Sequence, residues 1–157
     1  LGRKKKGQFE YRLRWDDVRY EPGELKAIAY KNGERWAEET IETTDAPFSL
    51  LMQADRNRIA ADGRDLAFVT LQVVDQKGRP MPDASVPLHF TIEGPGEIVA
   101  TDNGNAADMT PFHSSTRETF SGQALAIVRG GAGKPGSITI TATSPGLKES
   151  KFMLTTE

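Results

Sequence analysis

The residues whose types permit acid–base chemistry are few in this chain. Two pairs of neighbouring carboxylates stand out, Asp16-Asp17 and Glu38-Glu39, because acid–base catalysis often places two carboxyl groups across one substrate. Neighbours in an extended chain point to opposite faces, however. We therefore expect both pairs to be solvated surface charges that do not converge on one ligand.

A nucleophilic site is the second candidate. His113 is followed by Ser114 and Ser115, and either Asp108 or Asp102 could orient its ring. A Ser–His–Asp triad needs a histidine that contacts both other members, and residues adjacent in sequence rarely have that geometry. His89 lies on the polar side of its expected strand, where a surface role fits it. We predict no catalytic residue in this chain.

The sequence signals for a metal site and for a phosphate site are equally weak. The chain has no cysteine, which excludes thiolate metal sites and disulfides. Asp102-Asn103-Gly104-Asn105 lacks the ligand spacing of a calcium loop and fits an Asx-Gly turn. The glycine-rich run 130–136 opens a strand, whereas a phosphate loop opens a helix. We predict no metal and no cofactor.

Charge and hydropathy exclude two classes of partner. Lys and Arg total 20 against 22 Asp and Glu, giving a net charge of −2, and the two signs balance in both halves. We therefore expect no nucleic-acid partner, and we interpret the basic run Arg3-Lys4-Lys5-Lys6 as a solvated turn. No apolar run is long enough to span a membrane as a helix.

The aromatic residues are unevenly distributed. Both tryptophans and all three tyrosines fall between Tyr11 and Trp36. Trp15 and Trp36 are candidates for stacking on a sugar or facing a partner, and packing in a core or at a domain interface is the alternative. The pattern alone leaves both roles open.

The elements that would position these residues are β-strands. Val86, Leu88, Phe90 and Ile92 alternate with polar residues, as in an antiparallel sheet with one buried face. Turn signals recur about every ten residues, which is typical of an immunoglobulin-like β-sandwich. The predicted strands are Phe48–Ala54, Arg58–Ala60, Leu66–Asp75, Val86–Glu93, Glu97–Thr101, Ala124–Arg129, Ser137–Ser144 and Glu149–Thr155. The predicted core is Val69, Leu71, Val73, Leu88, Phe90, Ile92, Leu125, Ile127, Ile138, Ile140, Phe152 and Leu154, with the face chosen for Leu125 and Ile127 left open.

A shorter unit precedes this sandwich. Strands are predicted at Phe9–Trp15, Leu25–Tyr30 and Trp36–Thr43, with a hairpin turn at Asn32-Gly33. Three short strands make too small a core to be stable alone. The predicted organisation is all-β: residues 1–45 form the end of a truncated Ig-like domain, and residues 46–157 form an Ig-like β-sandwich.

One long polar loop interrupts the strand pattern, at Asn103–Ser121. Long ordered loops in compact domains are commonly functional or interfacial. We predict that this loop docks on a partner, and that Pro111, Phe112 and Phe120 anchor it. Asn103, Phe112 and His113 are its candidate partner-facing or sugar-facing residues.

Several of these segments resemble the C-terminal region of bacterial family 2 glycoside hydrolases of the β-galactosidase type. The first unit resembles the end of an Ig-like domain that follows the catalytic barrel, and the second resembles the final Ig-like domain. The matching residues include Tyr20-Glu21-Pro22-Gly23-Glu24-Leu25, Ala29-Tyr30-Lys31-Asn32-Gly33, Trp36-Ala37, Ala54-Asp55-Arg56, Ala61-Asp62-Gly63, Val73-Val74-Asp75, Ile92-Glu93-Gly94-Pro95-Gly96-Glu97-Ile98-Val99, Asp102-Asn103-Gly104 and Ala124-Leu125-Ala126-Ile127-Val128-Arg129.

The resemblance implies a non-catalytic tail of a retaining glycosidase, because that family's catalytic glutamates lie in the barrel. The other domains of the parent enzyme are then the expected partners, with carbohydrate as a further partner. A periplasmic or secreted bacterial location is expected. Two alternatives remain open: an adhesin or invasin-type Ig repeat of a bacterial surface protein, and a carbohydrate-binding module.

Overall fold

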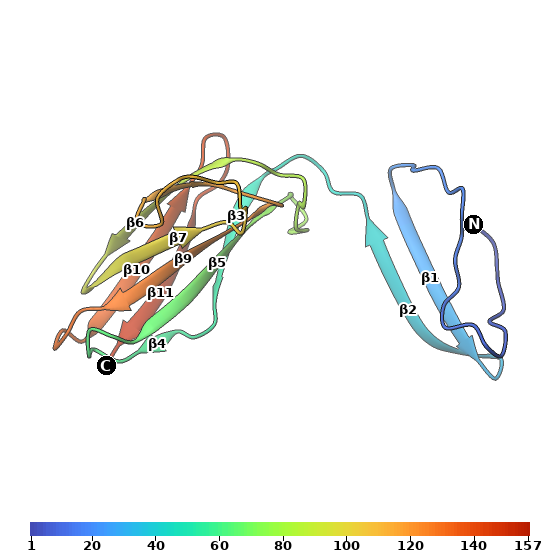
Figure 1. Ribbon diagram of the computed structural model, residues 1–157, viewed down its shortest axis with the longest axis horizontal. Helices are drawn as coiled ribbons and strands as arrows, with labels where there is room; N and C mark the ends of the chain where they lie inside the picture. Colours follow the sequence, from blue (N-terminus) through green and yellow to red (C-terminus); the bar gives the residue numbers. More distant parts are fainter. The chain divides into compact units, whose positions relative to one another are not determined.

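The computed structural model describes all residues, 1–157, and divides into two compact units, Leu1–Thr43 and Thr44–Glu157. The protein is all-β (Figure 1). It contains no helix, and therefore no helix that is long and apolar enough to cross a membrane. Each unit is described by itself.

The first unit contains a single hairpin of β1 (Glu24–Lys31) and β2 (Glu34–Glu42). Asn32 and Gly33 turn it with φ of 54° and 83°, the left-handed geometry that matches the twist of paired strands. The third strand predicted at Phe9–Trp15 is wrong, since this segment pairs with no strand. Its alternation of aromatic and basic residues resembles a half-buried strand, but Leu13 is the only one of its side chains that is not exposed.

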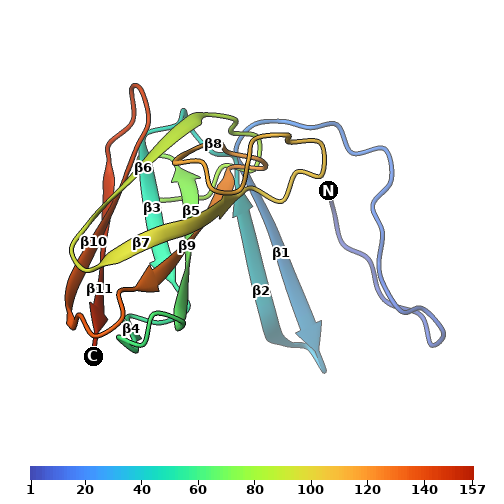
Figure 2. The same ribbon diagram turned by 60° about the vertical axis from the view of Figure 1, so that its left-hand side comes forward.

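The second unit is a β-sandwich of two sheets, visible from two sides in Figures 1 and 2. One sheet has the strand order β4-β11-β10-β6-β8, and the other has the order β3-β5-β9-β7. All the pairings within these sheets are antiparallel except β4 with β11. The strands are β3 (Ser49–Ala54), β4 (Arg58–Ile59), β5 (Leu66–Val74), β6 (Pro87–Glu93), β7 (Gly96–Asp102), β8 (Thr116–Glu118), β9 (Gln123–Gly130), β10 (Gly136–Thr143) and β11 (Ser150–Thr156).

The core lies between the two sheets. Alternate residues along β5, β6 and β10 point inward, and Phe90 is 1% exposed. Burying apolar surface in this way is the main stabilising contribution to the fold. Most of the predicted core is confirmed, and Ile92 and Phe152 pack against it while partly buried. The confirmed buried members are Val69, Leu71, Val73, Leu88, Phe90, Ile138, Ile140 and Leu154.

The face predicted for β9 is wrong. Ala124, Ala126 and Val128 are buried, whereas Leu125 and Ile127 are half-buried on the outer surface. Pairing with β5 fixes this register, since buried Val69 lies opposite Ala126. Both faces of β9 are apolar, so hydropathy alone does not distinguish them.

A buried carboxylate ties the start of the sandwich to the turn after β5. Asp75 accepts hydrogen bonds from the backbone N–H groups of Asp45 (3.1 Å), Lys77 (2.9 Å) and Arg79 (2.9 Å). The guanidinium of Arg79 donates to Asp75 Oδ2 at 2.7 Å and to Asp45 at 2.8 Å. Burial of the Asp75 carboxyl acts to raise its pKa, but the hydrogen bonds from Arg79, Asp45 and Lys77 lower the pKa well below its ordinary value.

Candidate functional site

The predicted loop Asn103–Ser121 is ordered and contains β8, which the sequence pattern does not reveal. Its turns are closed by short polar side chains. Asn103 Oδ1 accepts from the N–H of Asn105 (2.9 Å), and Asn105 Oδ1 accepts from the N–H of Ala107 (3.0 Å). Asp108 Oδ1 accepts from the N–H of Thr110 at 2.8 Å. Such side chains replace the partners that a sheet would supply to the backbone.

Arg117 anchors the loop to the sandwich. Its Nη2 donates to the carbonyls of Thr101 (2.7 Å) and Pro111 (2.9 Å), and its Nη1 donates to the carbonyl of Thr110 (3.0 Å) and to Asp108 Oδ2 (2.9 Å). The side chain of Arg117 is only 1% exposed. A planar guanidinium can satisfy several acceptors at once, so this one residue ties the middle of the loop, residues 108–111, to Thr101 of the sandwich.

Asp108 completes the anchor. The hydroxyl and backbone N–H of Thr110 and the guanidinium of Arg117 lower the pKa of Asp108 well below its usual range. Asn103 also belongs to this network, because its Nδ2 donates to Asp108 Oδ2 and to the Glu118 carbonyl, each at 2.9 Å. The amide of Asn103 is therefore engaged within the loop.

Two of the three anchors predicted from the sequence, Phe112 and Phe120, are wrong. Phe112 is 65% exposed and Phe120 is 46% exposed, and Pro111 contributes its carbonyl rather than its ring. The missed signal is Arg117 itself, the only Lys or Arg between Arg79 and Arg129.

The loop leaves an apolar tip in solvent. Met109 is 89% exposed and Phe112 is 65% exposed, while the Phe112 carbonyl accepts the N–H of Thr101 at 2.6 Å. His113 is also exposed. Apolar side chains presented on a fixed backbone are typical of protein contact surfaces.

The two tryptophans lie in the first unit. Trp15 is outside the strands and 38% exposed, and Trp36 is on β2 and 70% exposed. The Nζ atoms of Lys4 and Lys31 lie 5.5 Å and 5.4 Å from the ring centres of Trp15 and Trp36. These are cation–π distances, so each ring already has a cation near one face.

The acid–base candidates have other partners. Ser114 Oγ bonds Thr116 at 3.0 Å, and Asp108 is held by Arg117, so neither is joined to His113. Glu38 forms an ion pair with Lys26 at 2.9 Å. No group of three or more His, Asp or Glu side chains is placed to hold a metal ion.

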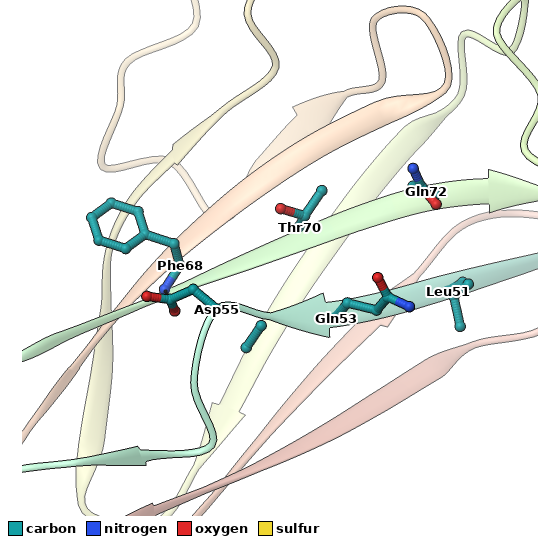
Figure 3. Close-up of a pocket in the computed structure, with 7 residues that line it drawn as sticks. Leu51, Gln53, Asp55, Phe68, Thr70 and Gln72 are labelled. Atoms are coloured by element: carbon teal, nitrogen blue, oxygen red, sulfur yellow. Dashed lines mark hydrogen bonds between the residues drawn. The ribbon is translucent and has the colours of Figure 1, made fainter.

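A hollow of about 280 Å³ lies on the outer face of the four-stranded sheet. Figure 3 shows its lining side chains projecting from two neighbouring strands. Gln53 lies directly opposite Thr70, and Leu51 lies opposite Gln72. The lining consists of Leu51, Gln53, Ala54, Asp55, Phe68, Thr70 and Gln72. None of the lining residues was among the candidate site residues predicted from the sequence.

Two family models match the chain. Residues 50–153 match glycoside hydrolase family 2 C-terminal domain 5, and residues 1–37 match a domain of unknown function, DUF4982. The first match covers most of the sandwich, including the loop and the hollow.

Two relatives align over most of the chain. A β-galactosidase of Bacteroides ovatus, BoGH2A, is 38% identical over 99% of this chain and 18% of its own length. A β-glucuronidase of Formosa agariphila is 30% identical over 88% of this chain and 14% of its own length. The chain therefore spans less than a fifth of each of these relatives.

A solved structure shares the fold. The crystal structure of a glycosyl hydrolase family 2 member from Bacteroides cellulosilyticus superposes with a TM-score of 0.84 at 34% identity. The match covers 89% of this chain and 18% of that chain.

Proposed function

Because this chain belongs to the glycoside hydrolase family 2 C-terminal domain 5 family, we propose that it is a non-catalytic accessory region of a β-glycosidase. The parent enzyme would hydrolyse a glycosidic bond by the retaining mechanism, with its catalytic carboxylates outside this chain. Relatives are named both β-galactosidase and β-glucuronidase. We therefore propose a β-glycoside as the substrate class of the parent enzyme and do not assign a particular sugar. Family membership favours this role over a surface adhesin repeat.

The apolar tip of the Arg117 loop carries the docking part of this proposal. Met109 and Phe112 project into solvent from a backbone that Arg117 holds in place. The ordering of this loop is achieved before any partner binds, which reduces the entropy lost on docking. The partner we propose is another domain of the parent enzyme, with an apolar pocket that receives the side chains of Met109 and Phe112.

The test compares the isolated chain with the parent enzyme. Met109→Ser/Phe112→Ser should leave the melting temperature of the isolated chain unchanged, because both side chains are exposed, but should lower that of the parent enzyme. Turnover of a small aryl glycoside should stay within about tenfold, since the loop holds no reacting group. Met153→Ser, at another site 70% exposed, is the matched control.

Equal melting temperatures for the double variant and wild-type parent would refute docking by this tip. Catalysis is tested separately, on the isolated chain with aryl β-galactosides and β-glucuronides. Turnover that persists through repurification and scales with protein concentration would refute the non-catalytic role.

A further inference from the structure

The hollow on the outer sheet face has polar groups with no partner in the protein. The side chains of Gln53, Thr70 and Gln72 line it, and none of the three takes part in a hydrogen bond, although the short polar side chains of the Arg117 loop are almost all engaged. Two amides and one hydroxyl offer both donors and acceptors. Their positions on adjacent strands β3 and β5 direct them to the same side of the sheet (Figure 3).

An aromatic ring lies at one end of this row. Phe68 is 41% exposed, and its backbone N–H donates to Asp55 Oδ1 at 2.8 Å. Ile127 is the cross-strand partner of Phe68 and supplies apolar surface beside it. The ring is thus fixed at its base while part of its surface stays open to a ligand.

The only charged side chain that lines the hollow, Asp55, is already ion-paired. Asp55 Oδ2 accepts from Arg56 Nε at 3.0 Å, and Arg56 also lies 3.6 Å from Asp65. No Lys or Arg side chain lines the hollow to attract an anionic ligand. A matching ligand is therefore neutral, rich in hydroxyl groups and equipped with an apolar face for the ring.

We propose that this hollow binds a neutral oligosaccharide, with Phe68 stacking on a sugar ring and Gln53, Thr70 and Gln72 hydrogen-bonding its hydroxyl groups. Phe68 and Gln72 are four residues apart on β5, which corresponds to about 13 Å along a strand. That length exceeds one pyranose ring, so the site accommodates at least a disaccharide. The proposal gives the chain a ligand of its own and does not depend on docking of the Arg117 loop.

The experiment is a titration of the ¹⁵N-labelled 157-residue chain with lactose, cellobiose and xylobiose, followed by ¹H–¹⁵N NMR shifts. At least one disaccharide should shift the amide signals of β3 and β5 with a Kd on the order of 1 mM, as expected of a small open site. Glycerol, a polyol without a ring, should not. Phe68→Leu keeps apolar volume but removes the ring and should weaken binding up to about tenfold.

Controls separate stacking at Phe68 from other aromatic sites. Phe112→Leu and Trp36→Leu should leave the affinity unchanged. If Phe68→Leu lowers the melting temperature, the double variant Gln53→Ala/Gln72→Ala replaces it as the test, and this variant should lose affinity for the disaccharide. The absence of shifts with every disaccharide, or shifts confined to the Arg117 loop or to Trp36, would overturn the assignment. Unaltered affinity in both the Phe68 and the paired glutamine variants would overturn it too.

Discussion

Arg117 Nη1 donates to Asp108 Oδ2 across 2.9 Å, in a pair whose side chains are 1% and 14% exposed. Burying a charge is costly unless it is paired and its hydrogen bonds are satisfied. Here the three carbonyls of Thr101, Thr110 and Pro111 and the hydroxyl of Thr101 accept from the remaining donors. The pair therefore orders a loop that has very little apolar burial of its own.

Arg117→Ala should lower the free energy of unfolding by about 3–5 kcal/mol, because it removes the buried cation that pairs with Asp108 and donates to three carbonyls. Arg117→Lys keeps the charge but loses the planar fork, so we expect a smaller yet clear loss. Urea unfolding of the isolated chain measures both. A loss below about 1 kcal/mol for the alanine variant would mean that the loop does not rely on this residue.

Acidification should destabilise the sandwich through Asp75 and Asp108. Both carboxyls have a pKa lowered on folding, so their stabilising contribution is complete above the ordinary carboxyl pKa of about 4 and is lost as pH falls below it. Melting temperature should therefore decrease on acidification through this range. Asp75→Asn should flatten this dependence, and an unchanged pH profile in that variant would contradict the role of Asp75.

Phe90→Ala should cost about 3–5 kcal/mol of unfolding free energy, because Phe90 is 1% exposed in the centre of the core and its removal leaves a cavity. Phe112→Ala is the matched control. Its ring is 65% exposed, so the expected change is within about 0.5 kcal/mol. Comparable losses in denaturant melts of the two variants would contradict the described core.

Gly122→Ala should be strongly destabilising. Gly122 has a φ of +72°, and an added Cβ would lie 2.0 Å from the Met81 carbonyl oxygen. Gly146 has a similar φ of +77° but open space around it, so Gly146→Ala should cost only the conformational strain of about 1–2 kcal/mol. Thermal melts of the two variants separate the steric effect from the backbone effect, and equal losses would argue against the close approach to Met81.

Regular alternation allowed most of the sandwich to be predicted from the sequence. The strand around Phe90 has one apolar and one polar face, so its register and burial follow directly. In β9, small alanines point inward while Leu125 and Ile127 point outward, and only pairing with β5 decides between the faces. The segment Phe9–Trp15 alternates like a strand, but a strand also needs a neighbour, which local sequence does not specify.

The candidate sites were harder to predict for a related reason. Arg117 acts through carbonyl groups of the folded backbone, and no residue pattern marks those carbonyls. The hollow joins Gln53 to Gln72 across two strands, so its residues come together only in the register of the sheet. The exposure of Phe112 and His113 agrees with a partner-facing loop, and whether any partner binds them stays a prediction.

The isolation of Arg117 also determines how this domain resists proteases. Trypsin cleaves after Lys or Arg, and from Pro80 to Val128 the only such residue is Arg117. Its side chain is sealed between the loop and the sandwich, so cleavage there requires the local structure to open first. The same residue that orders the loop is thus the only point between Pro80 and Val128 at which this protease could cut the chain, and folding itself conceals that point.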